Sequence, residues 1–175
     1  MKVSENCLEQ IKLHEGFRSK AYLDGGGVPT IGYGSTYYED KTKVKMGDVI
    51  TEERASELFK NVVSKFELGV LKLLKRTLKQ NEFDALVSLT YNIGLGNLTT
   101  SKLLAIINSD KYLDKTQYKL SEIGFNNSIL ERAKVDFTTL SLIKANFLKW
   151  SFDNGKFVEG LYLRRKKEGE LYERN

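Results

Sequence analysis

The stretch HEGFRSKAYLDGGGVPTIGYG, residues 14–34, decides the fold. Three consecutive glycines at 25–27 and the single proline of the chain, Pro29, interrupt any helix in this region. The segments on either side of them have the composition of β-strands, which predicts a hairpin. Asp24 is expected to end its first strand and Thr30 to begin its second. The strands are predicted over 21–23 and 30–34, with a third short strand over 42–46.

Before this hairpin, residues 4–15 are predicted to form a short helix. Ser4 can cap it, because a serine hydroxyl accepts a hydrogen bond from a free N–H of the first helical turn. Leu8, Ile11 and Glu15 are spaced i, i+3 and i+7, which places them on one helix face. A carboxylate therefore stands at the end of an otherwise apolar stripe and is expected to turn inward.

From Thr51 onward the pattern is helical, and Thr51 is expected to cap a long helix whose first residues are acidic. Asn81 is predicted to cap the next helix and Thr99 or Thr100 to open another. The predicted fold class is α+β, with a small lobe of helix and hairpin (about 1–55) and a larger helical lobe (about 56–175) in one domain. A cleft between the lobes is the expected ligand site. The remaining helices are predicted over 52–74, 115–123, 128–137, 141–152 and 158–173.

Glu15, Asp24 and Thr30 form the candidate catalytic set. Glycoside hydrolysis needs one carboxylic acid to protonate the leaving oxygen and one carboxylate to activate water. Glu15 is the expected acid, since the negative end of a helix dipole and apolar neighbours disfavour its charged form. Asp24, beside a solvated glycine turn, is expected to stay ionised, and the Thr30 hydroxyl could hold a water. Taken alone, these residues could equally be a solvated helix end, a turn aspartate and a strand threonine.

Several motifs, in the same order along the chain, carry a resemblance to a known family. Residues 15–24 fit E-G-x-R-x-x-x-Y-x-D, and residues 30–34 fit T-I-G-x-G. The chain resembles the phage-type lysozymes (glycoside hydrolase family 24) over its whole length except about 109–143. Further matching stretches are VKMGDVIT at 44–51, QNEFDALVS at 80–88, YNIG at 91–94 and GLYLRRKKEGELY at 160–172.

The resemblance implies a muramidase that cleaves the β-1,4 bond between N-acetylmuramic acid and N-acetylglucosamine in peptidoglycan, as phage or prophage endolysins do. It implies Glu15, Asp24 and Thr30 as catalytic residues and water as the nucleophile, with no cofactor or metal. Arg164 or Arg165 is expected to reach toward Glu15. Ser35 departs from the family, in which many members have histidine there. Expected substrate contacts are Gly32, Tyr33, Asn92 and Arg164.

Two alternatives of other kinds stay open. A lytic transglycosylase cuts the same bond without water and needs chiefly one acid, so Asp24 and Thr30 count against it. A non-enzymatic wall-binding protein on the same fold would not need the complete set of Glu15, Asp24 and Thr30. Clearing of permeabilised cells separates this second alternative from both enzymes.

Composition limits which binding partners and which cellular compartment are expected for this protein. The net charge is +5 and the pI near 9.1, which suits anionic partners such as wall polymers. No zinc-finger spacing, basic zipper or RNP stretch is present, so no nucleic-acid partner is expected. One cysteine, Cys7, and one histidine, His14, offer neither an internal disulfide nor a metal-ligand cluster. We expect a monomer without a signal peptide or membrane insertion, made in the host cytoplasm and acting on the cell wall.

Overall fold

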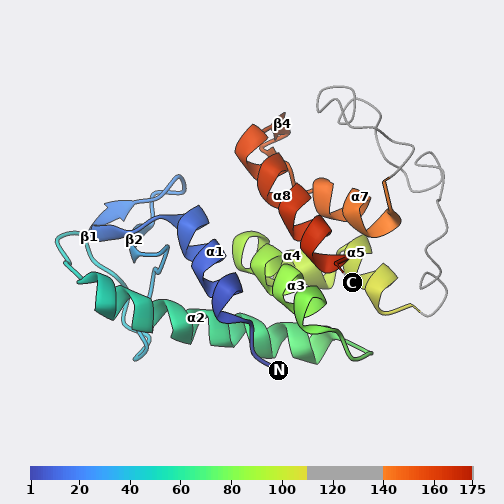
Figure 1. Cartoon of the computed structure of the whole chain (residues 1–175). Helices are drawn as coiled ribbons and strands as arrows, with labels where there is room; N and C mark the ends of the chain where they lie inside the picture. The colour runs from blue at the N-terminus through green and yellow to red at the C-terminus, as the bar shows by residue number, and fades with distance from the viewer. Residues whose placement is uncertain (110–139, 175) are drawn as a thin grey trace. The chain divides into compact units, whose positions relative to one another are not determined.

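A computed structural model describes residues 1–109 and 140–174 (Figure 1). The described chain contains helices and two small antiparallel sheets, which confirms the predicted α+β class. It divides into two compact units, Met1–Lys72 and Leu73–Asn175. This division falls later than the predicted lobe boundary near residue 55, because nearly the whole second helix belongs to the first unit. The helices predicted near 115–123 and 128–137 lie outside the described residues.

The first unit begins with helix α1, Glu5–Glu15, as predicted. The Ser4 hydroxyl accepts a hydrogen bond from the Cys7 N–H at 3.2 Å and caps the helix. Leu8 and Ile11 on its apolar face are buried. The helix ends at Gly16, whose φ of 69° takes the backbone out of the helical path. Glu15 is therefore the last helical residue.

The hairpin consists of strands β1, Arg18–Leu23, and β2, Pro29–Gly32. They pair antiparallel, with Tyr22 opposite Thr30. The third strand predicted over 42–46 does not form, and the nearest pairing there is an isolated bridge between Tyr37 and Lys43.

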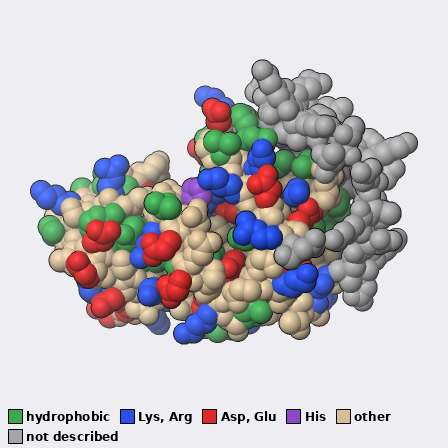
Figure 2. Space-filling model, in the orientation of Figure 1, with side chains coloured by type: hydrophobic (Ala, Val, Ile, Leu, Met, Phe, Trp, Pro, Cys, Tyr) green, Lys and Arg blue, Asp and Glu red, His purple; other side chains and the backbone are tan. Residues whose placement is uncertain are grey.

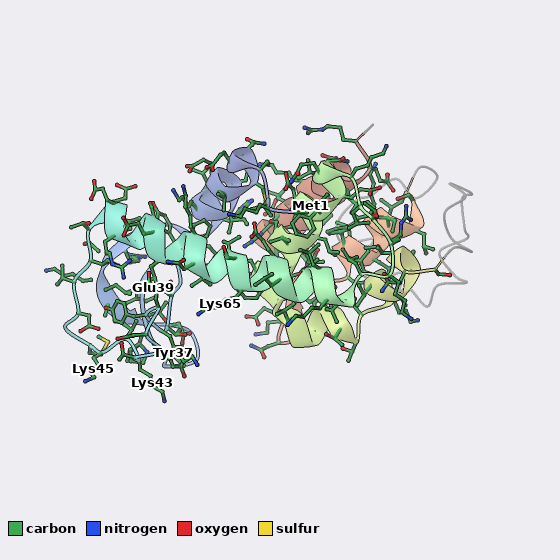
Figure 3. All side chains as sticks on the ribbon, turned by 90° about the horizontal axis from the view of Figure 1, so that it is seen from below. Met1, Tyr37, Glu39, Lys43, Lys45 and Lys65 are labelled. Atoms are coloured by element: carbon green, nitrogen blue, oxygen red, sulfur yellow. The ribbon has the colours of Figure 1, made fainter. Side chains whose placement is uncertain are left out.

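Side chains, together with a few backbone hydrogen bonds, hold the loop between β2 and helix α2, Glu52–Leu73 (Figure 3, where Tyr37, Glu39, Lys43 and Lys45 mark the loop). The Asp48 carboxylate accepts hydrogen bonds from the Tyr38 hydroxyl and the Lys45 N–H at 3.0 and 2.9 Å. The guanidinium of Arg54 donates to both carboxylate oxygens of Glu39, at 2.8 and 2.6 Å. Backbone hydrogen bonds also cross the loop, from the Tyr38 N–H to the Thr42 carbonyl at 2.9 Å and from the Val44 N–H to the Thr36 carbonyl at 3.0 Å, without forming a continuous strand.

Helix α2, Glu52–Leu73, is amphipathic and buries one face. The Thr51 hydroxyl accepts from the Arg54 N–H at 3.2 Å, as the predicted cap requires. Near its other end, the buried carboxylate of Glu67 accepts the Val3 N–H at 2.7 Å and ties down the start of the chain. None of the helices in residues 1–109 and 140–174 is both long and apolar enough to span a membrane. The buried apolar residues of α2 are Ala55, Leu58, Phe59, Val63 and Val70.

The second unit is built around helix α3, Gln80–Ile93, which contacts both the helix that follows it, α4 (Leu95–Thr99), and the C-terminal helix α8, Glu159–Tyr172. Every residue of α3 from Phe83 to Thr90 is buried, so this helix forms the core of the second unit. Helix α7, Leu142–Leu148, packs on α8. The other described elements of this unit are α5 Lys102–Ile107, β3 Phe152–Asp153 and β4 Lys156–Phe157.

Two predicted helix caps in this unit are wrong. α3 begins one residue before Asn81, and the Asn81 amide instead donates to three carbonyl oxygens at the C-terminal end of α8. Thr99 ends α4, while Ser101 caps α5 by accepting the Leu104 N–H at 3.1 Å. In both places the prediction chose the nearest suitable side chain in sequence as the cap. In the structure Asn81 bonds a distant helix end, and Ser101 is the cap of α5.

The helix predicted over 141–152 is too long. Helix α7 ends at Leu148, and the hairpin β3–β4, which we did not predict, follows it. Asn154 and Gly155 both have positive φ, 46° and 75°, as a two-residue turn of the primed type requires. The Asn-Gly pair was the available signal for this hairpin.

Candidate active site

The three candidate catalytic residues all lie in the first unit. Glu15 is the last residue of α1, Asp24 directly follows β1, and Thr30 is the second residue of β2. Asp24 and Thr30 are at the same end of the hairpin, because the strand register sets Thr30 opposite Tyr22. The side chains of Glu15 and Asp24 are partly buried and that of Thr30 is buried.

Tyr33 connects the end of α1 to the segment after β2. Its ring centroid lies 5.6 Å from that of Phe17 and 5.5 Å from Nζ of Lys12. Lys12 and Phe17 flank Glu15 in sequence, so the helix end that carries Glu15 is held beside the hairpin. The Tyr33 hydroxyl donates to Glu52 at 3.1 Å. Burial, and then this hydrogen bond, raises the pKa of Tyr33, which keeps the phenol protonated as a donor.

The Asp24 carboxylate is held by backbone of its own turn. Its Oδ1 accepts hydrogen bonds from the N–H groups of Gly26 and Val28, at 2.9 and 2.8 Å. The backbone closes the same turn twice, from Asp24 N–H to the Val28 carbonyl at 3.0 Å and from Gly27 N–H to the Asp24 carbonyl at 2.9 Å. Both hydrogen bonds to the carboxylate use Oδ1.

Thr30 is 2% exposed, and its hydroxyl donates to the Val28 carbonyl at 3.0 Å. The hydroxyl proton is therefore engaged, and what Thr30 can offer a water is an acceptor lone pair. Because the Val28 peptide groups bond to both Asp24 and Thr30, one residue sets the positions of both. Sequence reasoning missed Gly26 and Val28, although an aspartate two residues before a glycine is typical of a turn in which the side chain bonds its own backbone.

The four residues predicted to contact substrate lie in different settings. Gly32 has a φ of 64°, and a Cβ added there would stand 3.1 Å from Cβ of Ala55. Gly32 and Tyr33 are buried, so both have a packing role in the first unit. Asn92 is exposed on α3, and Arg164 is buried in α8. Substrate contact by these four residues stays a prediction.

The second unit holds a buried charged cluster around Glu168. Nε of Arg164 lies 3.2 Å from one Glu168 oxygen, and Nε of Arg165 lies 3.0 Å from the other. The Ser88 hydroxyl donates to Glu168 at 2.7 Å, and its carbonyl accepts from Arg164 at 3.2 Å. Both arginines are buried, at 5% and 0% exposure, so neither faces bulk solvent. That either of them reaches Glu15 stays a prediction.

Glu168 is a partner that sequence reasoning did not assign to these arginines. Its position three and four residues after them, on the same helix face, was the signal that could have done so. Among residues 1–109 and 140–174 no group of three or more histidine, cysteine or carboxylate side chains could hold a metal ion. The expectation that catalysis needs no metal or cofactor stays a prediction.

Comparison with known proteins yields concordant matches. A family model described as phage lysozyme matches residues 12–127. The endolysin of Bacillus phage B103 is 37% identical over 98% of this chain, which spans 54% of that protein's length. An endolysin from Escherichia coli O157:H7 phage FAHEc1 superposes with a TM-score of 0.70 at 32% identity, covering 99% of this chain and 94% of the other. A P22 lysozyme superposes equally well, with a TM-score of 0.70 at 31% identity over 98% of both chains.

Proposed function

This chain belongs to the phage lysozyme family, and we propose on that basis that it is a peptidoglycan muramidase. The bond cleaved is the β-1,4 linkage between N-acetylmuramic acid and N-acetylglucosamine. The observation that carries the proposal is that Glu15, Asp24 and Thr30 all fall inside the matched residues, with Asp24 and Thr30 at one end of a hairpin. The reaction is a hydrolysis, and the cell wall is where it takes place.

Glu15 is the proposed general acid. It donates its proton to the glycosidic oxygen as the bond from that oxygen to the anomeric carbon breaks. The helix end that carries it is held beside the hairpin through Tyr33, with Lys12 and Phe17 packed on the ring. This anchoring supports the role, because a proton donor must keep a fixed position relative to the base.

Asp24 is the proposed general base, and Thr30 assists it. Thr30 uses its hydroxyl proton on the Val28 carbonyl, so it can only accept from a water at its remaining lone pair. A water that donates one hydrogen to the Asp24 carboxylate and the other to Oγ1 of Thr30 keeps a lone pair for the anomeric carbon. As the new carbon–oxygen bond forms, the proton between water and Asp24 passes to the carboxylate, and the Glu15 proton leaves on the departing sugar.

This mechanism predicts hydrolysis with inversion of the anomeric configuration. An inverting pair of carboxyl groups stands about 6.5–9.5 Å apart to admit a water, against about 5–5.5 Å in a retaining pair. If Asp24 attacked directly, Thr30 would have no water to hold. Mass spectrometry and NMR of freshly digested peptidoglycan distinguish the outcomes. Inverted reducing ends support the proposal, retained ends refute the mechanism, and 1,6-anhydro ends indicate a transglycosylase.

Substitution tests the two carboxyl groups directly. Glu15→Gln should keep the fold and abolish lysis of permeabilised cells, because glutamine has nearly the same shape but no proton to donate. Asp24→Asn should be severely impaired through loss of the base and its charge. Glu5→Gln is the matched control, since Glu5 is an exposed acid on the same helix. Clearing by the Glu15→Gln protein at the wild-type rate would remove the central claim, and no clearing by wild type would favour a wall-binding protein.

We also propose that the protein acts as a monomer with no nucleic-acid partner. Figure 2 shows Lys and Arg side chains interspersed with Asp and Glu over the described part of the face in view, whereas a nucleic-acid groove needs basic residues gathered together. Light scattering after gel filtration tests whether the protein is a monomer. Titration with duplex DNA, begun at low salt, tests whether it binds nucleic acid. A dimer, or binding that survives physiological salt, would contradict them.

A further inference from the structure

The turn between the hairpin strands does more than reverse the chain. We infer that residues 26–28 are a positioning device, which holds the Asp24 carboxylate by Oδ1 and so assigns Oδ2 to the reacting water. Gly27 is the positioning residue on which the device depends. This inference rests on the proposed function of Asp24 as the base, and it adds which oxygen reacts and what orients it.

A carboxylate has two equivalent oxygens and a soft terminal torsion, so an aspartate on a solvated turn ordinarily rotates between several settings. In this structure Oδ1 accepts two N–H groups at once, from Gly26 at 2.9 Å and Val28 at 2.8 Å. Because the two donors belong to different peptide groups, they restrain the terminal torsion of the Asp24 side chain as well as the position of Oδ1. Oδ2 takes part in neither bond, so the turn makes the two oxygens inequivalent.

Gly27 makes this geometry possible. Its φ is +76°, in the region that side chains other than glycine and asparagine rarely adopt. This left-handed residue lies between the two donors and turns the Val28 N–H back toward the carboxylate. A Cβ at Gly27 would meet nothing within 4 Å, so a substitution there acts through the backbone and not through a clash.

The same turn also orients Thr30. The Val28 carbonyl accepts both the Asp24 N–H at 3.0 Å and the Thr30 hydroxyl at 3.0 Å. The lone pair that Thr30 offers to water is therefore set by the carbonyl of Val28, the same residue whose N–H helps to orient the Asp24 carboxylate. If Val28 is displaced, Asp24 and Thr30, the two proposed partners of the water, move together. The loss in turnover should therefore be larger than the loss of either hydrogen bond to the water alone would cause.

The test uses three variants of the full chain. Gly27→Val forces a β-branched residue into positive φ, Gly27→Asn supplies a residue that tolerates it, and Gly25→Ala is the matched control. Gly25 lies in the same loop, and a Cβ there meets nothing within 4 Å and needs no positive φ. With a soluble glycan substrate we expect kcat of Gly27→Val to fall about 10–100-fold with little change in KM, as for a misplaced base. Gly27→Asn and Gly25→Ala should stay within about threefold of wild type, a range well inside that positioning effect.

Amide hydrogen exchange of Gly26 and Val28 provides a readout that does not need activity. Both N–H groups should exchange slowly in wild type and Asp24→Asn, which keeps an acceptor oxygen, and fast in Asp24→Ala and Gly27→Val. Turnover by Gly27→Val equal to that of Gly25→Ala, or unprotected amides in wild type, would overturn the inference. If wild type lacks hydrolysis while the amides are protected as expected, the proposed function fails and the turn geometry stands.

Discussion

Replacing Gly32 by alanine should destabilise the first unit through two separable causes. Gly32 belongs to the T-I-G-Y-G motif, ends β2 and is buried close to Ala55 of α2. Its φ of +64° is strained for any residue with a Cβ. The added Cβ would also lie 3.1 Å from Cβ of Ala55 and 3.7 Å from its Cα, and the first of these distances is too short.

The size of the effect follows from these two terms. A left-handed backbone costs an L-residue about 1–2 kcal/mol. Forcing one methyl into a packed interior costs about 1–3 kcal/mol. Gly32→Ala should therefore lower the free energy of unfolding by about 2–5 kcal/mol. For a chain of this length each kcal/mol corresponds to about 2–4 °C in Tm, so the drop should be easily measurable.

A double-mutant cycle separates the terms. Ala55→Gly removes the Cβ that clashes, leaving the new methyl at an ordinary 3.7 Å from the Ala55 Cα. The single change Ala55→Gly costs about 1 kcal/mol of helix propensity. Combined with Gly32→Ala, it should be about 1–3 kcal/mol more stable than the sum of the single variants, because the contact term vanishes while the φ term stays.

Urea denaturation of the four proteins gives the coupling energy. A coupling below about 0.5 kcal/mol, the limit for independent sites, would refute the packing explanation. The same set tests the predicted substrate contact of Gly32. If its role is packing alone, Gly32→Ala assayed well below its Tm should keep the wild-type KM, whereas a raised KM would indicate contact with the glycan.

Two further predictions concern charges. Glu168→Gln should cost about 3–5 kcal/mol, because it removes the buried negative charge that pairs with both Arg164 and Arg165, while Glu170→Gln on the exposed face should change Tm little. Hydrogen bonds from Arg54 lower the pKa of Glu39 from 4.5 to about 2, so this pair stabilises the fold above pH 4.5 and the contribution is lost as pH falls toward 2. Since both side chains are partly exposed, the amount is at most about 1 kcal/mol. Glu39→Gln should therefore flatten the acid limb of stability against pH, and an unchanged slope would contradict this.

Much of the fold could be predicted because its signals are local. The Ser4 cap, the glycines before Pro29 and the acidic residues after Thr51 each act on backbone within one turn, and the predicted helix, hairpin and long helix are confirmed. The family was likewise predictable from residue types at fixed spacings, which need no coordinates, and the phage lysozyme match confirms it. The roles of Glu15 as general acid and Asp24 as general base rest on the same spacings and stay predictions.

Tertiary structure alone decided which partner each polar group meets. Asn81 could have capped its own helix, yet its amide donates to carbonyls about ninety residues later in sequence. Asp48 and Glu39 hold a loop where local composition predicted a strand. A polar side chain can bond any donor or acceptor within reach, so groups that the packing of apolar faces brings close compete with those close in sequence. A pattern along the chain indicates which groups are close in sequence, but only the packed structure determines which partner a polar side chain meets.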